Sequence, residues 1–230
     1  MVLTADRLLS VWAKGCERHP IDRGLLLYAL AVPDTPASEL ADRPLGERNS
    51  ALLRLHQALF GEELTGWCDC PHCGERLEFA LSCSDLLAPA ASTEPMAEVA
   101  GRPCRPPTSR DLAEISQLDD PEQAMWRLLQ RCCGDPGDPA PPALLVAFEA
   151  ALERADPCAD YNLQLECAAC GQAATVPFDV AHFLWEELTA QARRLLDEVH
   201  LLARAYGWSE SGILALSPVC RRAYLTRVLA

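Results

Sequence analysis

The chain has 230 residues and a mass of 25.1 kDa, with half of its residues hydrophobic and 23% charged, which excludes a largely disordered protein. Its net charge of −13 argues against a protein that wraps a nucleic-acid backbone. No apolar run reaches the ~18 residues of a membrane-spanning helix, and the N-terminus lacks the pattern of a signal peptide. We therefore expect a protein that stays in the compartment where it is made and does not insert into a membrane.

The beginning of the chain predicts a helical N-terminal region over residues 1–66. Apolar residues recur every three or four positions, and Thr4 and Pro20 are typical of the first residues of helices. Three helices are expected, over residues 4–15, 20–30 and 46–60. The segment 33–44 is rich in Pro, Asp and Ser and is predicted to be a loop.

Two short cysteine motifs interrupt this helical pattern, and strand-like segments flank them. Residues 66–74 predict a tight turn, and residues 76–81 then alternate between polar and apolar side chains as a half-buried strand does. The second motif lies between two similar strand-like segments, 161–166 and 173–178. We expect two β-hairpins that form the halves of one zinc ribbon, over residues 67–103 and 160–180.

Residues 104–159, between the two hairpins, predict a helical insertion. Helices are expected after Thr108, from Pro121 to Cys132, and from Leu144 to Arg154. The stretches 87–107 and 134–142 are rich in proline and are predicted to be irregular.

The last part of the chain, 181–230, predicts a C-terminal helical module. A long helix follows Asp179 and ends at Gly207, and two short helices follow it. This part is nearly neutral, because it contains six arginines and five acidic residues, whereas the rest of the chain is strongly acidic. Arg193 and Arg194 precede Asp197 and Glu198 by four residues, a spacing that favours ion pairs within the helix. The apolar stripe of the long helix predicts a core contact, and the alternative is a groove for a partner. The whole chain is thus predicted to be mostly α with a small β zinc ribbon, an α+β protein.

The two cysteine motifs predict a metal site. Each has the form Cys-x-x-Cys-Gly, and together they supply Cys70, Cys73, Cys167 and Cys170. Two residues between the cysteines let one turn direct both sulfurs at a single ion, and the glycine permits the positive φ that closes the turn. We expect one structural zinc ion per chain, held by four sulfurs with no open position for water. The 93 residues between Cys73 and Cys167 separate the halves of this site unusually widely.

Other arrangements of the cysteines stay open. Cys68 and Cys83 could complete a local site with the first motif. The two motifs could also form separate sites, redox-active pairs or buried thiols that bind no metal. Without a secretion signal we do not expect a disulfide framework. Most of the remaining cysteines are predicted to be small apolar core residues: Cys16, Cys104, Cys132, Cys133, Cys158 and Cys220.

No catalytic or phosphate-binding motif is present, so the sequence does not predict an enzyme. The five histidines show no metal-binding spacing and are predicted to be solvent-facing or packed. Zinc ribbons often bind nucleic acid, which makes a nucleic-acid-binding or transcription-associated protein the alternative function. Acidic residues outnumber Arg76 around the motifs, and this balance disfavours that alternative.

Several segments resemble baseplate-hub or hub-assembly proteins of T-even-type phage tails and related bacterial contractile injection systems. The resemblance involves residues 44–49, 51–55, 60–61 and the first cysteine motif, and then 105–112, 205–210 and 213–218. It implies a non-enzymatic structural or chaperone-like protein of the baseplate, whose partners are hub, spike or tube proteins. It also implies a bacterial cytoplasmic location, with incorporation into an injection particle. The family has no catalytic residues to transfer, so the zinc would serve stability.

Overall fold

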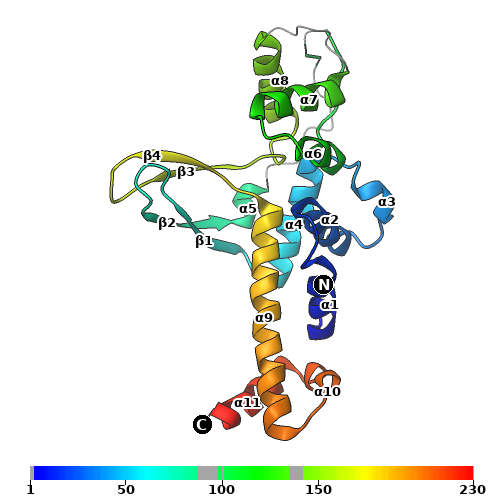
Figure 1. The fold of residues 1–230 in the computed structure, drawn as a ribbon, viewed down its shortest axis with the longest axis vertical. Coiled ribbons are helices and arrows are strands. Elements are labelled where there is room, and N and C mark those ends of the chain that lie inside the picture. Colours follow the sequence, from blue (N-terminus) through cyan, green and yellow to red (C-terminus); the bar gives the residue numbers. More distant parts are fainter. Residues whose placement is uncertain (1–2, 88–97, 100, 135–141, 230) are drawn as a thin grey trace.

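The computed structural model describes residues 3–87, 98–99, 101–134 and 142–229. It is mostly helical with two small antiparallel sheets, which confirms the α+β class (Figure 1). The helices are α1 (Ala5–Gly15), α2 (Pro20–Ala31), α3 (Ala37–Leu40), α4 (Leu45–Leu59), α5 (Cys83–Leu86), α6 (Ser109–Ile115), α7 (Pro121–Cys133), α8 (Pro142–Ala155), α9 (Val180–Tyr206), α10 (Glu210–Leu214) and α11 (Pro218–Leu229). The strands are β1 (Glu63–Asp69), β2 (Arg76–Ser82), β3 (Asn162–Glu166) and β4 (Ala173–Pro177). The short α3 lies inside the segment 33–44, for which the sequence predicts a loop.

The main core lies where α1, α2 and α4 pack against α9 (Figure 1). Leu52 of α4 and Leu188 of α9 are fully buried there. Asp179 begins α9 by accepting hydrogen bonds from the backbone N–H groups of Ala181 and His182. The N-terminal helices and the first half of α9 therefore share one core. None of the helices in the described residues, the 27-residue α9 included, is long and apolar enough to cross a membrane.

At the other end of α9, the helices α10 and α11 fold back against it. Ile213 of α10 and Leu202 of α9 are fully buried, so this part of the apolar stripe is a core contact. Three aromatic rings pack against one another beside it, those of Tyr206, Trp208 and Tyr224.

The two β-hairpins project together from one side of the helical body (Figure 1). Their apolar faces meet at Leu77 of β2 and Leu165 of β3, next to the cysteines. The strand β1 begins at Glu63, earlier than the tight turn that the sequence predicts over 66–74. Gly66 has no side chain and so interrupts the alternation of polar and apolar side chains that indicates a strand. The glycine is needed because a Cβ there would come within 2.6 Å of the ring of Phe79.

The insertion has a core of its own, built from the facing sides of α7 and α8. Phe148 and Leu129 are almost fully buried in it. The three predicted helices are present as α6, α7 and α8. About half of the predicted irregular stretch 87–107 is outside the described residues, as is most of the loop 134–142.

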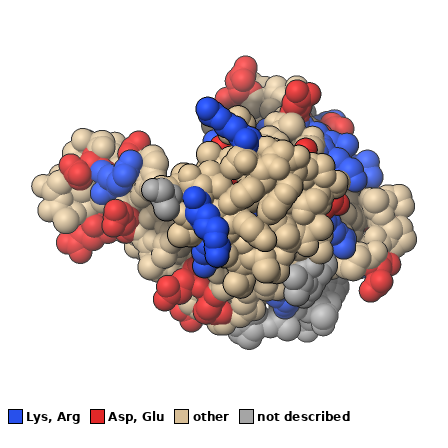
Figure 2. Space-filling view, turned by 90° about the horizontal axis from the view of Figure 1, so that it is seen from below, with Lys and Arg blue, Asp and Glu red and all other residues tan. Residues whose placement is uncertain are grey.

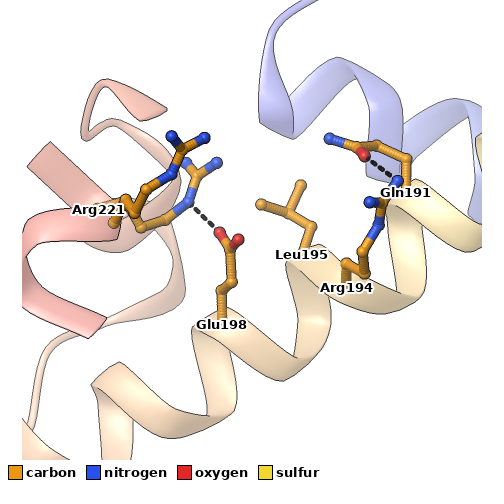
Figure 3. A pocket seen from close by; sticks show the side chains of 6 residues that line it. Gln191, Arg194, Leu195, Glu198 and Arg221 are labelled. Atoms are coloured by element: carbon orange, nitrogen blue, oxygen red, sulfur yellow. Dashed lines mark hydrogen bonds and ion pairs between the residues drawn. The ribbon is translucent and has the colours of Figure 1, made fainter. Parts of the chain in front are cut away.

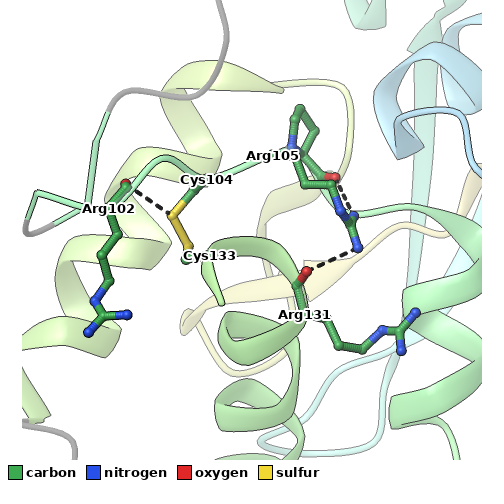
Figure 4. Close-up of a disulfide and its surroundings, with 6 residues drawn as sticks. Arg102, Cys104, Arg105, Arg131 and Cys133 are labelled. Atoms are coloured by element: carbon green, nitrogen blue, oxygen red, sulfur yellow. Dashed lines mark hydrogen bonds between the residues drawn. A yellow bond between two sulfur atoms is a disulfide. The ribbon is translucent and has the colours of Figure 1, made fainter. Parts of the chain in front are cut away.

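A disulfide joins Cys104 to Cys133 in this core (Figure 4). Both cysteines are buried core residues, as the sequence predicts, but it does not predict that they are paired. Cys132 and Cys158 are buried as well, whereas Cys16 and Cys220 are exposed, contrary to the prediction for most of these cysteines. Cys133 is the last residue of α7, and Arg105 donates its backbone N–H to the carbonyl of Cys132. This hydrogen bond holds the chain around Cys104 against the end of α7, which brings the two sulfurs together.

The start of α4 joins the insertion to the helical body. Gly46 donates its backbone N–H to the carboxylate of Asp156 over 2.9 Å, and a Cβ at Gly46 would overlap that carboxylate. Buried Asn49 donates to the carbonyls of Cys158 and Ala159 over 2.9 and 3.1 Å. The same amide accepts two hydrogen bonds from the buried guanidinium of Arg48. These contacts fix the chain where it leaves the insertion.

Asn49→Ala is expected to lower the free energy of unfolding by about 2 kcal/mol or more, because the buried carbonyl of Cys158 loses its donor and the buried guanidinium of Arg48 loses two of its hydrogen bonds. Thermal unfolding measures this as a drop of roughly 5 °C in Tm. Gln57→Ala, which removes an exposed amide from the same helix, is the control and should change Tm little. Equal effects of the two substitutions would show that the amide of Asn49 does not hold this junction.

Candidate metal centre

The four cysteines of the two motifs lie together at the tips of the hairpins. The sulfurs of Cys70, Cys73, Cys167 and Cys170 are all within 4.8 Å of one another. Cys70 Sγ is 3.9 Å from Cys170 Sγ, and Cys73 Sγ is 3.7 Å from Cys167 Sγ. Four sulfurs at about 2.3 Å from one ion in a tetrahedron would be about 3.8 Å apart. The four cysteines are therefore close enough to hold one metal ion, as the spacing of the motifs predicts.

The two motifs have the same backbone geometry. The first cysteine of each donates its N–H to the carbonyl five residues later, Cys70 to Glu75 and Cys167 to Gln172. Its own carbonyl accepts from the glycine N–H that closes the turn. These glycines, Gly74 and Gly171, have φ values of 75° and 68°, a region that favours glycine over other residues. The local sequence thus forms each half of the site, and the fold brings the halves together.

The thiols influence one another's ionisation. Hydrogen bonds from the backbone N–H of Cys170, and then of Ala169, lower the pKa of Cys167 to about 7. The backbone N–H of Glu75 lowers the pKa of Cys73, but burial and hydrogen bonds with the neighbouring thiols outweigh it and raise this pKa to about 12. Four thiolates at this spacing repel one another, and a bound cation would compensate their charge.

The remaining candidate ligands lie outside this cluster. Cys68 is half-buried beside it, but among the described residues the metal-binding group consists of the four motif cysteines. His72 is exposed, and its Nε2 lies 3.3 Å from the carbonyl of Ala173 in the opposite hairpin. The side of the projecting hairpins that Figure 2 shows carries several acidic side chains with basic ones among them. On the first hairpin, the guanidinium of Arg76 lies over the exposed ring of Trp67, with its central carbon 4.1 Å from the centroid of the ring.

Cys83, the other predicted spare ligand, belongs to a group that the sequence does not reveal. Its sulfur lies 3.4 Å from Nδ1 of His56, and Nε2 of His56 lies 2.6 Å from a carboxylate oxygen of Glu187. A thiol, an imidazole and a carboxylate in this order resemble a nucleophile with its base and orienting group. Cys83 and His56 are fully buried, however, and burial raises the pKa of the thiol. We interpret the group as a structural contact between α4, α5 and α9.

Glu187→Ala is expected to lower the free energy of unfolding by about 1–3 kcal/mol, because it leaves the buried Nε2 of His56 without a partner. Denaturant unfolding measures this loss. Glu186→Ala removes the neighbouring exposed carboxylate and should leave stability nearly unchanged. A Glu187→Ala protein as stable as the Glu186→Ala protein would contradict the structural role of the pair.

Comparison with known proteins adds no relative: no protein-family profile, no curated protein and no solved structure matches this chain.

Proposed function

We propose that the chain is a non-enzymatic structural or assembly protein whose two hairpins form one zinc ribbon around a single structural zinc ion. The observation that supports this most directly is the set of four motif sulfurs at tetrahedral spacing. Four cysteine sulfurs are the ligand set of structural zinc, and they fill its coordination shell. A filled shell leaves no position for a substrate, so the ion would stabilise the fold.

We propose further that this protein serves the baseplate of a contractile phage-tail-like injection system, with hub, spike or tube proteins as partners. Support comes from the segments that resemble such proteins. The segment 44–49 includes Gly46, Arg48 and Asn49, which join the insertion to the body. The segments 205–210 and 213–218 cover the end of α9, the two ends of α10 and the turns on either side of α10. In this proposal the protein is cytoplasmic and enters the particle during assembly.

The nucleic-acid-binding alternative has less support. Asp69, Glu75, Glu78 and Glu166 place negative charge on the hairpins that would have to approach a phosphate backbone.

Disruption of the gene in its native host tests the baseplate proposal. Electron microscopy is expected to show tubes and sheaths without baseplates, or no particles. Wild-type protein and the Cys220→Ser variant, which changes an exposed thiol, should restore complete particles, and Cys70→Ser should not. Complete, functional particles in the absence of the gene would refute the proposal.

A further inference from the structure

A pocket lies between α9 and α11, far from the metal centre, and three arginines line it (Figure 3). The hollow measures about 190 Å³. Its lining residues are Gln191, Arg194, Leu195 and Glu198 of α9 and Arg221 and Arg222 of α11. The α9 residues lie three or four positions apart and thus share one helix face. The pocket therefore combines cationic side chains with an apolar floor at Leu195.

The ion pair expected within α9 does not form, because α11 supplies a different partner. Glu198 binds the guanidinium of Arg221, which is 7% exposed and needs a counter-charge. Arg194 instead donates to the amide oxygen of Gln191 over 2.8 Å. Arg194 therefore has no carboxylate partner among the described residues.

Arg222 strengthens the positive charge of the pocket. Its side chain is exposed, and no carboxylate of the described residues pairs with it. The N-terminal end of α11 carries the partial positive charge of the helix dipole, and its first turn contains no acidic residue that would offset it. This charge adds to that of the arginines. One glutamate against three arginines leaves the pocket cationic on a chain with a net charge of −13.

We propose that this pocket binds a carboxylate-bearing segment, an acidic peptide, of a partner protein. A guanidinium can form paired hydrogen bonds with a carboxylate, and one arginine of the pocket, Arg221, already binds a carboxylate, that of Glu198. Val219 of α11 is 77% exposed and offers a further apolar contact to such a segment.

The surroundings favour a peptide over a nucleic acid. A phosphate backbone requires an extended track of positive charge. The face that Figure 2 shows carries its basic side chains as separate groups and not as a continuous track, and the chain as a whole is acidic. This inference goes beyond the proposed structural role and does not require it, because the pocket is separate from the four cysteines.

Fluorescence anisotropy with fluorescein-labelled hexaglutamate tests the proposal on the full chain. The wild-type protein is expected to bind the peptide saturably, more weakly as salt is added. The double variant R194A/R222A should bind at least tenfold more weakly. R204A/R227A removes two exposed arginines from the same two helices outside the pocket, so it matches the change in net charge and should bind nearly as the wild type does. Circular dichroism verifies that all three proteins are folded.

Several results would overturn the proposal. If the wild-type protein did not bind the peptide, the pocket would not be a peptide site. If both double variants lost affinity equally, the binding would depend on the net charge of the chain and not on the pocket. Arginine-dependent binding of inorganic phosphate or of a hexathymidylate that is as tight as that of hexaglutamate would make the pocket a phosphate site. Self-association of the wild type that R194A/R222A abolishes, measured by light scattering, would make a second copy the occupant.

Discussion

Cys70→Ser and Cys167→Ser are each expected to reduce the metal content from one ion per chain to none. Each substitution removes one of four ligands, and the two residues lie on different hairpins, so equal losses follow only if both hairpins share one ion. The hairpins depend strongly on this ion, because the buried core between them is small: Cys70, Leu77 and Cys167. Structural zinc contributes on the order of 10 kcal/mol of apparent binding free energy in small zinc domains, so the ribbon should unfold.

The helical body should survive the loss of the ion, because its large core does not include the four motif cysteines. Elemental analysis and circular dichroism of the purified variants measure the two effects. Cys68→Ser, in the same ribbon but outside the cluster, and Cys220→Ser, on α11, are the controls and should keep the full metal content. Metal retained by Cys167→Ser would refute the shared site, and metal lost from Cys220→Ser would add that residue to the ligands.

Asp111→Asn is expected to destabilise the insertion by about 3–5 kcal/mol, because it removes the charge that holds two arginines. Asp111 is fully buried, and its oxygens lie 2.6–2.8 Å from the guanidinium nitrogens of Arg105 and Arg131. It also completes a capping box with Thr108 at the start of α6. Asp42→Asn breaks the exposed pair with Arg110 and should cost less than about 1 kcal/mol. Urea unfolding at pH 7 compares the variants, and equal effects would contradict the account.

The same carboxylate predicts a pH dependence. Burial alone would raise the pKa of Asp111, but hydrogen bonds from Arg105, Arg131 and Thr108 outweigh it and hold the pKa below its usual value. A lowered pKa contributes stability above the unfolded value of about 3.9, and this stability disappears as the pH falls further. The stability difference between wild type and Asp111→Asn should therefore shrink below pH 4. The loss of metal in acid affects both proteins alike, so a difference that stays constant with pH would contradict this assignment.

The parts of the fold that the sequence predicts are those that short segments determine. The caps at Thr4, Asp120 and Asp179 accept backbone hydrogen bonds at the helix starts where the sequence places them. The candidate metal site is equally local in origin, because the glycine after each pair of cysteines closes its turn. The start of β1 is less predictable, because Gly66 interrupts the alternation of polar and apolar side chains. The reason for a glycine there is the nearby ring of Phe79, which is visible only in the folded structure.

The contacts that the sequence does not predict join residues far apart in the chain. Cys83 and His56 are 27 residues apart and form no motif. Cys104 and Cys133 are paired by the approach of two segments, which the number of cysteines cannot reveal. Glu198 has the correct spacing for Arg194, but buried Arg221 has a greater need for a counter-charge. In each case the packing of separate elements decides between partners that local spacing leaves open.

The zinc K-edge X-ray absorption spectrum of the purified wild-type protein tests the central claim most directly. One ion shared by Cys70, Cys73, Cys167 and Cys170 predicts four sulfur ligands at about 2.3 Å and no nitrogen or oxygen ligand. A nitrogen or oxygen atom in the first shell, or a protein that contains no zinc, would contradict the shared four-sulfur site.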